Sequence, residues 1–512
     1  MIKIYNQFYT DYIEEKATNA LGNRSVLELC ERQANGFCSL FRRTFGDNHR
    51  ILVFAGPGRN GAIALAVARI LHSMGLGVEA LVLNPTGLLS DECQANMRQL
   101  MEVKCSVREV TTSFNPPLIK PEDIVIDGIC GIELNVPFAG DLALVAQYIN
   151  KKKSLVVSID IPSGLMCEDN RNNNMDSVIQ ATHTFTFNGP KYPFFFKEYA
   201  PYVGKWQIID VALDEPDANN MVKRYLFSLS DVYGLILHRQ KFSHKYDYGR
   251  IALIAGSKGM VGAAALAGKA AMRAGAGHLT IHVPQGYAPT IHTYLPEALV
   301  DEDLDSSCFS MFSNAERYDA IGIGPGLGRH FTSAKALENL LSYYNKPMVI
   351  DADAIHLLAA NKSLLERIPQ DSILTPHASE LDALVGPSDN DFDRVEKASE
   401  FAVKHKVIVV LKGAYSATCT KSGRIIFNAT GNPGMATAGT GDVLTGVILG
   451  LLGRGYRPLL AALIGVFICG YAGDRYAEDY CQESLIAEDI IDYLPKVFKY
   501  FKVDGDTSYG IL

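Results

Sequence analysis

The segment from 428 to 452, NATGNPGMATAGTGDVLTGVILGLL, constrains this chain more than any other. An Asn-Pro-Gly turn and a run of small residues lead to Gly439-Thr440-Gly441-Asp442, and apolar residues at helical spacing follow at once. The pattern predicts a helix whose N-terminus is wrapped in glycine. Such a terminus offers unpaired backbone N–H groups and the positive end of the helix dipole, so it favours an anion such as phosphate.

Asp442 is the residue that a passive phosphate cradle does not explain. Gly439 and Gly441 carry no Cβ, so the backbone can approach an anion closely, whereas a carboxylate beside a resting phosphate would repel it. The same carboxylate could take a proton from a hydroxyl that attacks the phosphate, while the N–H groups stabilise the developing charge. The alternative is an ordinary first-turn acid that favours the helix dipole.

Several predicted strands in the second half of the chain end on glycine or on polar residues. In chain order they end on Gly324-Pro325-Gly326-Leu327-Gly328, Asp351-Ala352-Asp353-Ala354, Thr375-Pro376-His377-Ala378-Ser379-Glu380 and Lys412-Gly413. Because parallel strands bring their carboxyl ends to one edge, these groups predict a single cleft over a parallel sheet. Together they describe phosphoryl transfer, with Asp442 as base, Lys412 near nucleotide phosphates and acids to place Mg²⁺.

Each of these residues also has a simpler interpretation when it is taken alone. His377 could cap a turn, Lys412 could be a solvated loop charge, and Glu380 could be a first-turn acid of a helix. No Walker sequence occurs in the chain, so a P-loop enzyme is not expected.

The first half of the chain opens like a Rossmann-like sheet. A short apolar strand at 51–55 is followed by the loop Gly56-Pro57-Gly58-Arg59-Asn60-Gly61, a helix at 63–74 and a strand at 78–83. The glycine pattern alone is weak, because it lacks the G-x-G-x-x-G register and is equally typical of a tight turn. Two further strands stop on Asp127 and Asp160 beside glycine, which suits ribose, metal or proton-transfer roles.

The length of 512 residues exceeds one ordinary core, so two or more domains are expected. The polar, proline-containing segment 214–220 is the predicted boundary, which gives domains 1–222 and 223–512. A net charge of −8 without a long Lys/Arg block argues against nucleic acid as a partner.

Three features point to the cytoplasm and away from membranes. Acids near the N-terminus interrupt any signal-peptide core. The uncharged run 458–473 is shorter than the roughly 20 apolar residues that span a bilayer, so we expect a buried helix there. Ten cysteines are scattered without a C-x-x-C pair, as in a reducing compartment.

Residues 20–212 resemble the NAD(P)HX epimerase domain. The resemblance rests on the helix around Ser25 to Ala34, the Gly58 to Gly61 loop, the strand ending at Asp127, Ile159-Asp160-Ile161-Pro162-Ser163-Gly164, and Thr184-Phe185-Thr186-Phe187 before Pro190-Lys191. It implies a Rossmann-like three-layer sandwich that binds the hydrated cofactor. By position it implies potassium ligands at Asn60, Asp127 and Ser163, all oxygen donors suited to a hard cation, and a substrate-binding acid at Asp160.

This chain departs from the epimerase pattern at two loops. Where the family has G-N-N-G-G-D-G, it has Gly58-Arg59-Asn60-Gly61-Ala62-Ile63-Ala64, and where the family has F-G-T-G-L, it has Cys130-Gly131-Ile132-Glu133-Leu134. Isoleucine cannot accept a hydrogen bond, and the added Cβ atoms narrow the approach to a ligand. The departures predict either a weakened epimerase or a domain kept for assembly.

Residues 225–500 resemble the ADP- or ATP-dependent NAD(P)HX dehydratase, a relative of ribokinase-fold kinases. The resemblance rests on the Gly-Pro-Gly-Leu-Gly, Asp-Ala-Asp-Ala, Thr-Pro-His, Leu-Lys-Gly-Ala and Asn-Pro-Gly-Met-Ala-Thr…Gly-Thr-Gly-Asp-Val-Leu motifs. It implies a ribokinase-like α/β domain. It also implies a cofactor-binding set and a nucleotide-binding set: Ala263, Gly326, His377 and Asp442 for the hydrated cofactor, and Lys412, Gly413, Ala414, Tyr415, Ser416 and Gly441 for the nucleotide.

The resemblance implies a nicotinamide-repair reaction. Asp442 would take the proton of the 6-hydroxyl of NADHX or NADPHX, the terminal phosphoryl group of ADP (or ATP) would move onto that oxygen with Mg²⁺, and loss of phosphate would restore the dihydronicotinamide. The family's single-chain form favours ADP, and its members often assemble, which implies a homo-oligomer. One alternative is a ribokinase-like kinase that acts on a small alcohol. Another is a nucleotide-binding scaffold without turnover, but the presence of Asp442 argues against the scaffold.

Overall fold

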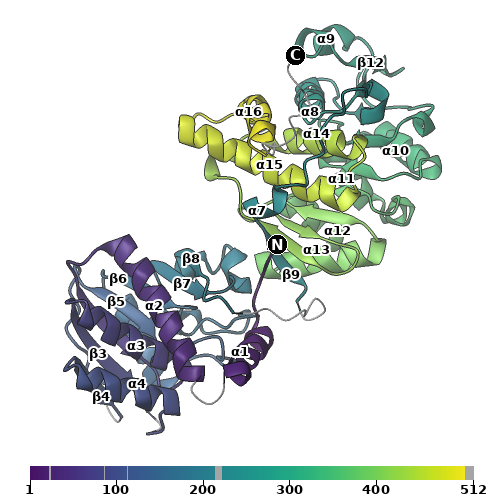
Figure 1. Ribbon diagram of the computed structural model, residues 1–512. Coiled ribbons are helices and arrows are strands. Elements are labelled where there is room, and N and C mark those ends of the chain that lie inside the picture. Colours follow the sequence, from purple (N-terminus) through teal and green to yellow (C-terminus); the bar gives the residue numbers. More distant parts are fainter. Residues whose placement is uncertain (22–24, 86, 112–113, 214–221, 502–512) are drawn as a thin grey trace, which may run out of the picture. The chain divides into compact units, whose positions relative to one another are not determined.

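The computed structural model describes residues 1–21, 25–85, 87–111, 114–213 and 222–501 (Figure 1). Contacts within the chain divide it into two compact units, which are Lys3–Val222 and, with Met1–Ile2 added to it, Lys223–Leu512. Each unit is built on its own largely parallel sheet flanked by helices, so the predicted α/β class with two domains is confirmed. The predicted boundary segment, 214–220, lies outside the described residues.

The N-terminal unit holds a seven-stranded sheet in the order β4-β3-β2-β5-β6-β7-β8, in which neighbouring strands are parallel. Its strands are β2 (Arg50–Ala55), β3 (Gly77–Leu83), β4 (Ser106–Val110), β5 (Ile124–Gly128), β6 (Leu155–Ile159), β7 (His183–Phe187) and β8 (Lys205–Ile209). The strand order reverses at β2, which lies between β3 and β5. A ligand site is therefore expected beside the carboxyl ends of β2 and β5.

Helices cover both faces of this sheet. They are α1 (Gln7–Leu21), α2 (Ser25–Phe45), α3 (Arg59–Ser73), α4 (Asp91–Glu102), α5 (Gly140–Asn150) and the short α6 (Ala200–Val203). The side chains of α2, α3 and α4 share one core with one face of the sheet, and those of α5 share a second core with the other face. This is the predicted three-layer arrangement. The helix predicted from Ile63 begins at Arg59, because the second half of the glycine loop forms its first turn.

The C-terminal unit holds an eleven-stranded sheet in the order β1-β9-β18-β17-β16-β15-β14-β13-β10-β11-β12. Its strands are β1 (Ile2–Lys3), β9 (Arg224–Phe227), β10 (Arg250–Ile254), β11 (His278–Val283), β12 (Leu299–Glu302), β13 (Ala320–Ile323), β14 (Met348–Ile350), β15 (Ile373–Leu374), β16 (Ile408–Leu411), β17 (Ala417–Cys419) and β18 (Ile425–Asn428). β17 pairs antiparallel with both its neighbours, whereas β10 to β16 are parallel. The order reverses at β10, between β11 and β13, which places a ligand site at their carboxyl ends.

The helices of this unit form two groups (Figure 1). They are α7 (Leu229–Val232), α8 (Val261–Arg273), α9 (Ala288–Tyr294), α10 (Phe331–Tyr343), α11 (Ala352–Ala360), α12 (Ala378–Val385), α13 (Asp391–His405), α14 (Thr440–Gly453), α15 (Pro458–Asp479) and α16 (Ala487–Tyr500). Right-handed crossovers from β13 to β16 put α10 to α13 on one face. The crossover from β10 to β11 runs the other way, so α8 covers the opposite face, with α14 and α16 packed against it and α15 packed against α14 and α16.

Small residues let α14 approach α8 closely. A Cβ at Gly446 would lie 2.0 Å from the Ala267 carbonyl oxygen, and one at Gly450 would lie 2.5 Å from the Ala271 carbonyl oxygen. Both contacts are far inside van der Waals distance, so these positions require glycine. The close approach fixes the N-terminus of α14 over the sheet edge, where the chemistry is expected.

Helix α15 is the one helix in the described part of the chain that is long and apolar enough to cross a membrane by length and composition. It extends beyond the uncharged run noted in the sequence, to Asp479. About 67% of its most apolar window is buried inside the unit, as expected for a core helix.

Candidate active site

The N-terminus of α14 is shaped by a left-handed residue. Gly439 is the N-cap with φ +92°, and a Cβ there would lie 2.8 Å from Leu266 Cδ1 and 3.0 Å from Ala487 Cβ. Glycine at 439 is thus required by the turn and by packing against the protein. Gly441 faces polar groups instead, because a Cβ there would lie 3.4 Å from Lys412 Nζ and 3.8 Å from Asp351 Oδ2.

Lys412 is held at this helix terminus by two acids. Its Nζ donates to Asp351 Oδ1 at 2.8 Å and lies 3.7 Å from Glu380 Oε2, and its side chain is 21% exposed. Burial by itself would lower the pKa of Lys412, but the charges of Asp351 and Glu380 raise the pKa above its ordinary value. The solvated-loop interpretation is therefore wrong, and Lys412 is a fixed cation beside the glycine-lined helix terminus.

Asp351 links this lysine to α14 itself. The carboxylate is 1% exposed, and its second oxygen accepts a 2.8 Å hydrogen bond from the buried Thr445 hydroxyl. Thr445 lies one helical turn beyond Gly441, so the bond fixes the strand-end acid relative to the first turn of the helix. The sequence showed Asp351 only as an acid at a strand end, and it gave Thr445 no role; its spacing from Gly441 was the available signal.

Asp442 lies in an environment that disfavours its charge. Burial, and then the charge of Asp351, raise the pKa of Asp442 to about 7, although Lys412 opposes them. Among the described residues, no hydrogen bond to the Asp442 carboxylate is found. A carboxyl group with this pKa is matched to proton transfer near neutral pH, which an ordinary first-turn acid is not.

Ala263 and Gly326 meet at the carboxyl ends of β10 and β13. Gly326 has φ +59°, and a Cβ there would lie 3.0 Å from Ala263 Cβ and 2.6 Å from the Met260 carbonyl oxygen. The Ser257 hydroxyl donates to the Gly326 carbonyl at 2.9 Å. The structure thus brings together two residues that the resemblance assigned to the hydrated cofactor.

The residue Asp353, which follows β14, links this glycine loop to the same edge of the sheet. The Asp353 carboxylate accepts from the Gly328 N–H at 2.9 Å. The charge of Asp353 also raises the pKa of Asp442, after burial and Asp351. The glycine loop after β13 and the first turn of α14 are therefore within electrostatic reach of each other.

His377 is the N-cap of α12. Its backbone N–H donates to Glu380 Oε2 at 2.8 Å, its Nδ1 accepts from the Glu380 N–H at 3.3 Å, and its side chain is 51% exposed. The capping interpretation describes these bonds, and Glu380 is the first-turn acid of the same helix. Because Glu380 also lies 3.7 Å from Lys412, the cap lies beside the fixed cation, and the ring of His377 is exposed there.

The loop from Lys412 to Ser416 joins β16 to β17. Gly413 and Ala414 are exposed, and the Gly413 N–H lies 3.4 Å from the Ser416 hydroxyl oxygen that it donates to. Tyr415, between them, is half-buried. The loop places accessible backbone next to the fixed cation Lys412, as expected of a nucleotide-binding segment.

The three predicted potassium ligands converge in the N-terminal unit, around the carbonyl group of Cys130. Asn60 Nδ2 donates to that carbonyl at 2.9 Å, and the Ser163 hydroxyl donates to it at 3.1 Å. The Asp127 carboxylate lies behind them and accepts from the Ser163 N–H at 2.9 Å. Burial raises the pKa of Asp127 above its ordinary value, against hydrogen bonds from Ser163 and Ser158.

Asp160 lies in a different local environment from Asp127. It has φ +66°, and its Oδ1 accepts from Lys191 Nζ at 2.6 Å and from the Thr186 hydroxyl at 3.0 Å. Lys191 is 1% exposed, so this is a buried ion pair. No partner of Lys191 could be identified from the sequence, because Asp160 and Lys191 follow two different strands.

The residues that depart from the epimerase pattern close the α3 terminus. Ile63 is 3% exposed and packs in the hydrophobic core that α2, α3 and α4 share with the sheet, so its side chain faces neither solvent nor the loop. The Glu133 carboxylate lies against the start of α3, 3.7 Å from where a Cβ at Gly58 would be. An acid at this helix terminus occupies the place that would favour a phosphate.

Arg59, also new at this loop, forms an ion pair with Glu14 of α1. Burial raises the pKa of Glu14 to about 7, although Arg59 opposes this. The pair ties α1 to the first turn of α3 over the loop.

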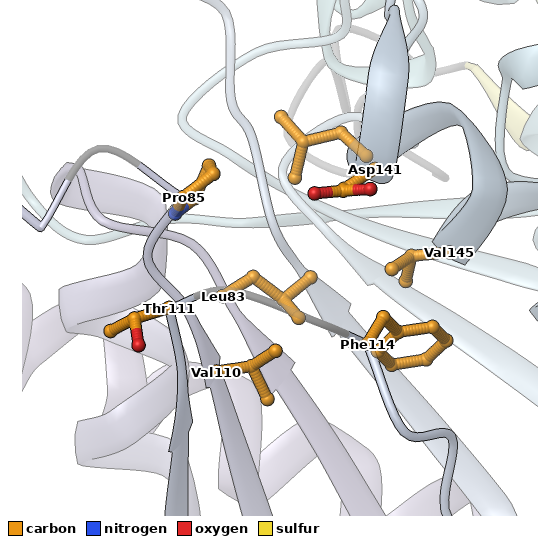
Figure 2. Close-up of a pocket in the computed structure, with 8 residues that line it drawn as sticks. Leu83, Pro85, Val110, Thr111, Phe114, Asp141 and Val145 are labelled. Carbon is orange, nitrogen blue, oxygen red and sulfur yellow. The ribbon is translucent and has the colours of Figure 1, made fainter.

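A small crevice lies elsewhere on this unit, between the ends of β3 and β4 and the start of α5 (Figure 2). Leu83, Val110, Phe114 and Val145 point toward one another there, with Asp141 at the rim. Its volume is about 20 Å³, which holds roughly one water molecule. The crevice is too small for a nucleotide.

Comparisons with known proteins cover both units. Residues 251–496 match the family model described as NAD(P)H-hydrate dehydratase, and residues 26–192 match the model of the YjeF-related protein N-terminus. A bifunctional NAD(P)H-hydrate repair enzyme Nnr of Moorella thermoacetica is 33% identical over 479 residues, which cover 90% of this chain and 89% of that relative. The Escherichia coli enzyme of the same name is 29% identical over 497 residues, covering 96% of this chain and 93% of the relative.

A similar solved structure covers about half of this chain. The ADP/ATP-dependent NAD(P)H-hydrate dehydratase of Bacillus subtilis, co-crystallised with ATP/Mg²⁺, is 33% identical, with a TM-score of 0.49 over 54% of this chain and 99% of that one. The matches of two family models in the expected order, and of full-length relatives over nine-tenths of the sequence, leave one assignment. The chain belongs to the family of bifunctional NAD(P)H-hydrate repair enzymes, with an N-terminal unit of the YjeF-related type and a C-terminal NAD(P)H-hydrate dehydratase unit.

Proposed function

We propose that the C-terminal unit dehydrates (6S)-NADHX and (6S)-NADPHX with ADP as the phosphoryl donor and Asp442 as the base. The observation that carries the proposal is the arrangement around the first turn of α14. An acid whose pKa is raised to about 7 by burial lies beside a glycine-lined helix terminus and the fixed cation Lys412. A base matched to neutral pH, an anion-binding terminus and a cation are the parts that phosphoryl transfer requires.

Each side chain then has a defined role in the proposed reaction. Asp442 accepts the proton of the substrate 6-hydroxyl, whose oxygen bonds to the terminal phosphorus of ADP as the bond to AMP breaks. The N–H groups at Gly441 and the Lys412 ammonium stabilise the transferred phosphoryl group. Phosphate then leaves C6 while a proton leaves C5, which restores the dihydronicotinamide. Phosphorylation is useful because phosphate is a far better leaving group than hydroxide.

Binding roles follow from the positions of the other residues. Ala263, Gly326 and His377 would contact the hydrated cofactor, and residues 413–416 would contact the nucleotide. Asp351, Asp353 and Glu380 supply carboxylate oxygens at the same edge, the donor type that Mg²⁺ prefers. Mg²⁺, when bound with the nucleotide, would offset phosphate charge.

The direct test is recovery of dihydronicotinamide absorbance. The complete protein is incubated with Mg²⁺, ADP and an equilibrated mixture of R and S hydrated NADH. We expect absorbance to return with one AMP and one phosphate formed per NADH. No recovery, together with phosphorylation of another alcohol, would instead identify a small-molecule kinase.

We further propose that the N-terminal unit epimerises the R and S hydrates weakly, with Asp160 contacting the substrate. Ile63 buried in the core, Glu133 against the α3 terminus and the Arg59–Glu14 pair all support a restricted site. The same assay measures this activity. Recovery that stops at the share of the S epimer, under conditions where spontaneous epimerisation is slow, would show that the unit serves assembly only.

A potassium site in the N-terminal unit is part of the proposal. Asn60, Ser163 and the Cys130 carbonyl offer oxygen donors, and Asp127 is a fully buried acid with no basic side chain bonded to it in the described part of the chain. A monovalent cation would balance that charge, and hard oxygen donors suit it. The bound ion would fix the loop between β5 and α5, which neighbours Asp160.

The expected result is a cation-specific stabilisation of the N-terminal unit. If K⁺ is present at about ten times its dissociation constant, it should add about 1.4 kcal/mol to the unfolding free energy. Thermal unfolding followed by the fluorescence of Trp206, the single tryptophan, reports on this unit. KCl should raise the midpoint above that in LiCl of equal ionic strength, and Asp127→Asn should remove the difference. Equal midpoints in the unaltered protein would contradict the site.

For partners and location, we propose a homo-oligomer in the cytoplasm that acts on small molecules and binds neither nucleic acid nor membranes. The ten free cysteines, of which eight are buried, support a reducing compartment. The net charge of −8 supports the absence of nucleic acid.

A further inference from the structure

A pocket of about 490 Å³ lies in the C-terminal unit, away from the cleft just described. Its walls include Ala274 and Gly275, which follow α8, and Arg454, which follows α14. Ala274 and Gly275 lie just before β11, and Arg454 lies at the C-terminal end of α14, whose first turn carries Asp442. The pocket therefore opens at the amino ends of the parallel strands. Since α8 has 13 residues, its two ends are about 20 Å apart. The pocket and the cleft are therefore separate sites.

The charges in this pocket are all of one sign. Its lining residues include five basic side chains and no acid, and the basic side chains are His238, Arg239, Arg273, Arg454 and Lys499. Within the described ranges, none of them forms an ion pair with an acid. In a chain of net charge −8, this is a local excess of positive charge that the acids among residues 222–501 leave unbalanced.

Two of these basic side chains donate hydrogen bonds to backbone carbonyl groups near the C-terminal ends of helices. Arg454 donates to the Ala274 carbonyl at 3.2 Å and to the Leu237 carbonyl at 2.6 Å, and Arg239 donates to the Gly275 carbonyl at 2.8 Å. Three helices, α8, α14 and α16, end here, and each terminus carries about −0.5 elementary charge. Three arginines and one lysine exceed that requirement, so helix capping does not account for all of them.

Arg454 shows that the pocket lacks an acceptor. Its Nε is buried and has no hydrogen-bond partner. Burial, and in addition the charge of Arg239, lower the pKa of Arg454 below its ordinary value, which Tyr456 only partly opposes. An anion bound in the pocket would stabilise this guanidinium group by supplying the opposite charge nearby.

The rest of the lining is apolar. Ile236, Leu237, Met272, Pro495 and Phe498 line the pocket beside the basic groups. Apolar lining with a few convergent charges is typical of a site for an organic anion rather than for a free inorganic ion. We propose that this pocket binds a phosphorylated organic molecule, with its phosphate group near Arg239, Arg273 and Lys499 and its organic part on Met272 and Phe498.

Binding of phenyl phosphate to the complete protein, measured by isothermal titration calorimetry, tests this site. The variant Arg273→Ser/Lys499→Ser removes two exposed charges in the last turns of α8 and α16. We expect its dissociation constant to rise at least tenfold, because two charge-assisted contacts are lost. Lys335→Ser/Lys404→Ser, which removes two exposed charges outside the pocket, should bind as the unaltered protein does. Unchanged affinity in the first variant, or non-saturable binding, would overturn the proposal.

A second variant tests the organic part of the ligand. Phe498→Ala should weaken phenyl phosphate several-fold and leave the binding of inorganic phosphate unchanged. If phenyl phosphate and inorganic phosphate bind the unaltered protein with equal affinity, the pocket recognises only the phosphate group, and the assignment of an organic ligand is wrong. Titration with AMP tests whether the organic part is a nucleoside. If AMP binds more tightly than phenyl phosphate, and Arg273→Ser/Lys499→Ser removes that difference in affinity, the ligand is a nucleotide rather than another phosphorylated molecule.

Discussion

Asp442→Asn is expected to lower kcat for dehydration of hydrated NADH by about 10²–10⁴-fold, the range lost when a general base is removed. Asparagine keeps the size of the side chain but cannot accept the 6-hydroxyl proton. Neither Lys412 nor the Gly441 backbone is altered, so binding of ADP should change little. Steady-state kinetics from absorbance recovery measure kcat, and calorimetric titration with ADP and Mg²⁺ measures nucleotide binding. Dehydration at the native rate in this variant would refute the proposed mechanism.

The pH dependence of the unaltered enzyme follows from the same group. Burial raises the pKa of Asp442 to about 7, so the carboxyl is protonated and inactive as a base below that value. We expect kcat/KM to increase tenfold per pH unit below about 7 and to level off above it. A flat profile between pH 5 and 8 would show that another group takes the proton.

Asp442→Asn also has an expected effect on stability, which controls for unfolding. A carboxyl whose pKa is higher in the folded than in the unfolded state loses stability as pH rises from about 4 to 7, because the unfolded chain ionises first. Above pH 7 the full cost of burying the charge is present. Asparagine removes it, so the variant should be more stable by about 1–2 kcal/mol at pH 8. An inactive variant that is more stable cannot owe its inactivity to misfolding.

Lys191→Met is expected to destabilise the N-terminal unit by about 3–5 kcal/mol, the usual cost of breaking a buried ion pair by removing one partner. Lys191 is 1% exposed and its ammonium group lies 2.6 Å from Asp160 Oδ1, so the variant leaves an uncompensated carboxylate in the interior. Urea unfolding followed by Trp206 fluorescence measures the change, because the single tryptophan lies in β8 of this unit.

Two controls separate the ion pair from general effects of lysine replacement. Lys153→Met, at an exposed position of the same unit, should change the unfolding free energy by less than about 0.5 kcal/mol. Asp160→Asn combined with Lys191→Met should recover part of the loss, since no buried charge then remains. If Lys191→Met and Lys153→Met unfold alike, the pair does not stabilise the fold.

The cleft of the C-terminal unit was predictable because its groups belong to short, continuous motifs. The Gly-Thr-Gly-Asp turn predicts both a helix N-terminus and a base, and strand ends in a parallel sheet meet at one edge whatever the loops between them do. His377, Lys412 and Asp442 therefore lie at the edge that the sequence predicts. The pKa values and ion pairs of these side chains could not be predicted, because they depend on neighbours that are distant in the chain.

In the N-terminal unit, too, contacts between distant segments could not be predicted from the sequence. The sequence identified Ile63 and the changed loop as departures, but the inward packing of Ile63, the position of Glu133 and the bond from Arg59 to Glu14 each join separate segments. Helix α3 also begins four residues earlier than the apolar pattern suggests, because Arg59 to Ala62 carry no strong periodic signal.

The sequence alone determined the two-part α/β organisation, the glycine-wrapped helix terminus and the acid in its first turn, because backbone geometry and hydrophobic periodicity are local properties. Only the tertiary structure decided that the pKa of Asp442 is about 7, that Lys412 is held by Asp351 and Glu380, and that basic groups from four separate segments line one pocket. Burial and charge interactions depend on distance in space, and the fold sets that distance between residues far apart in the chain.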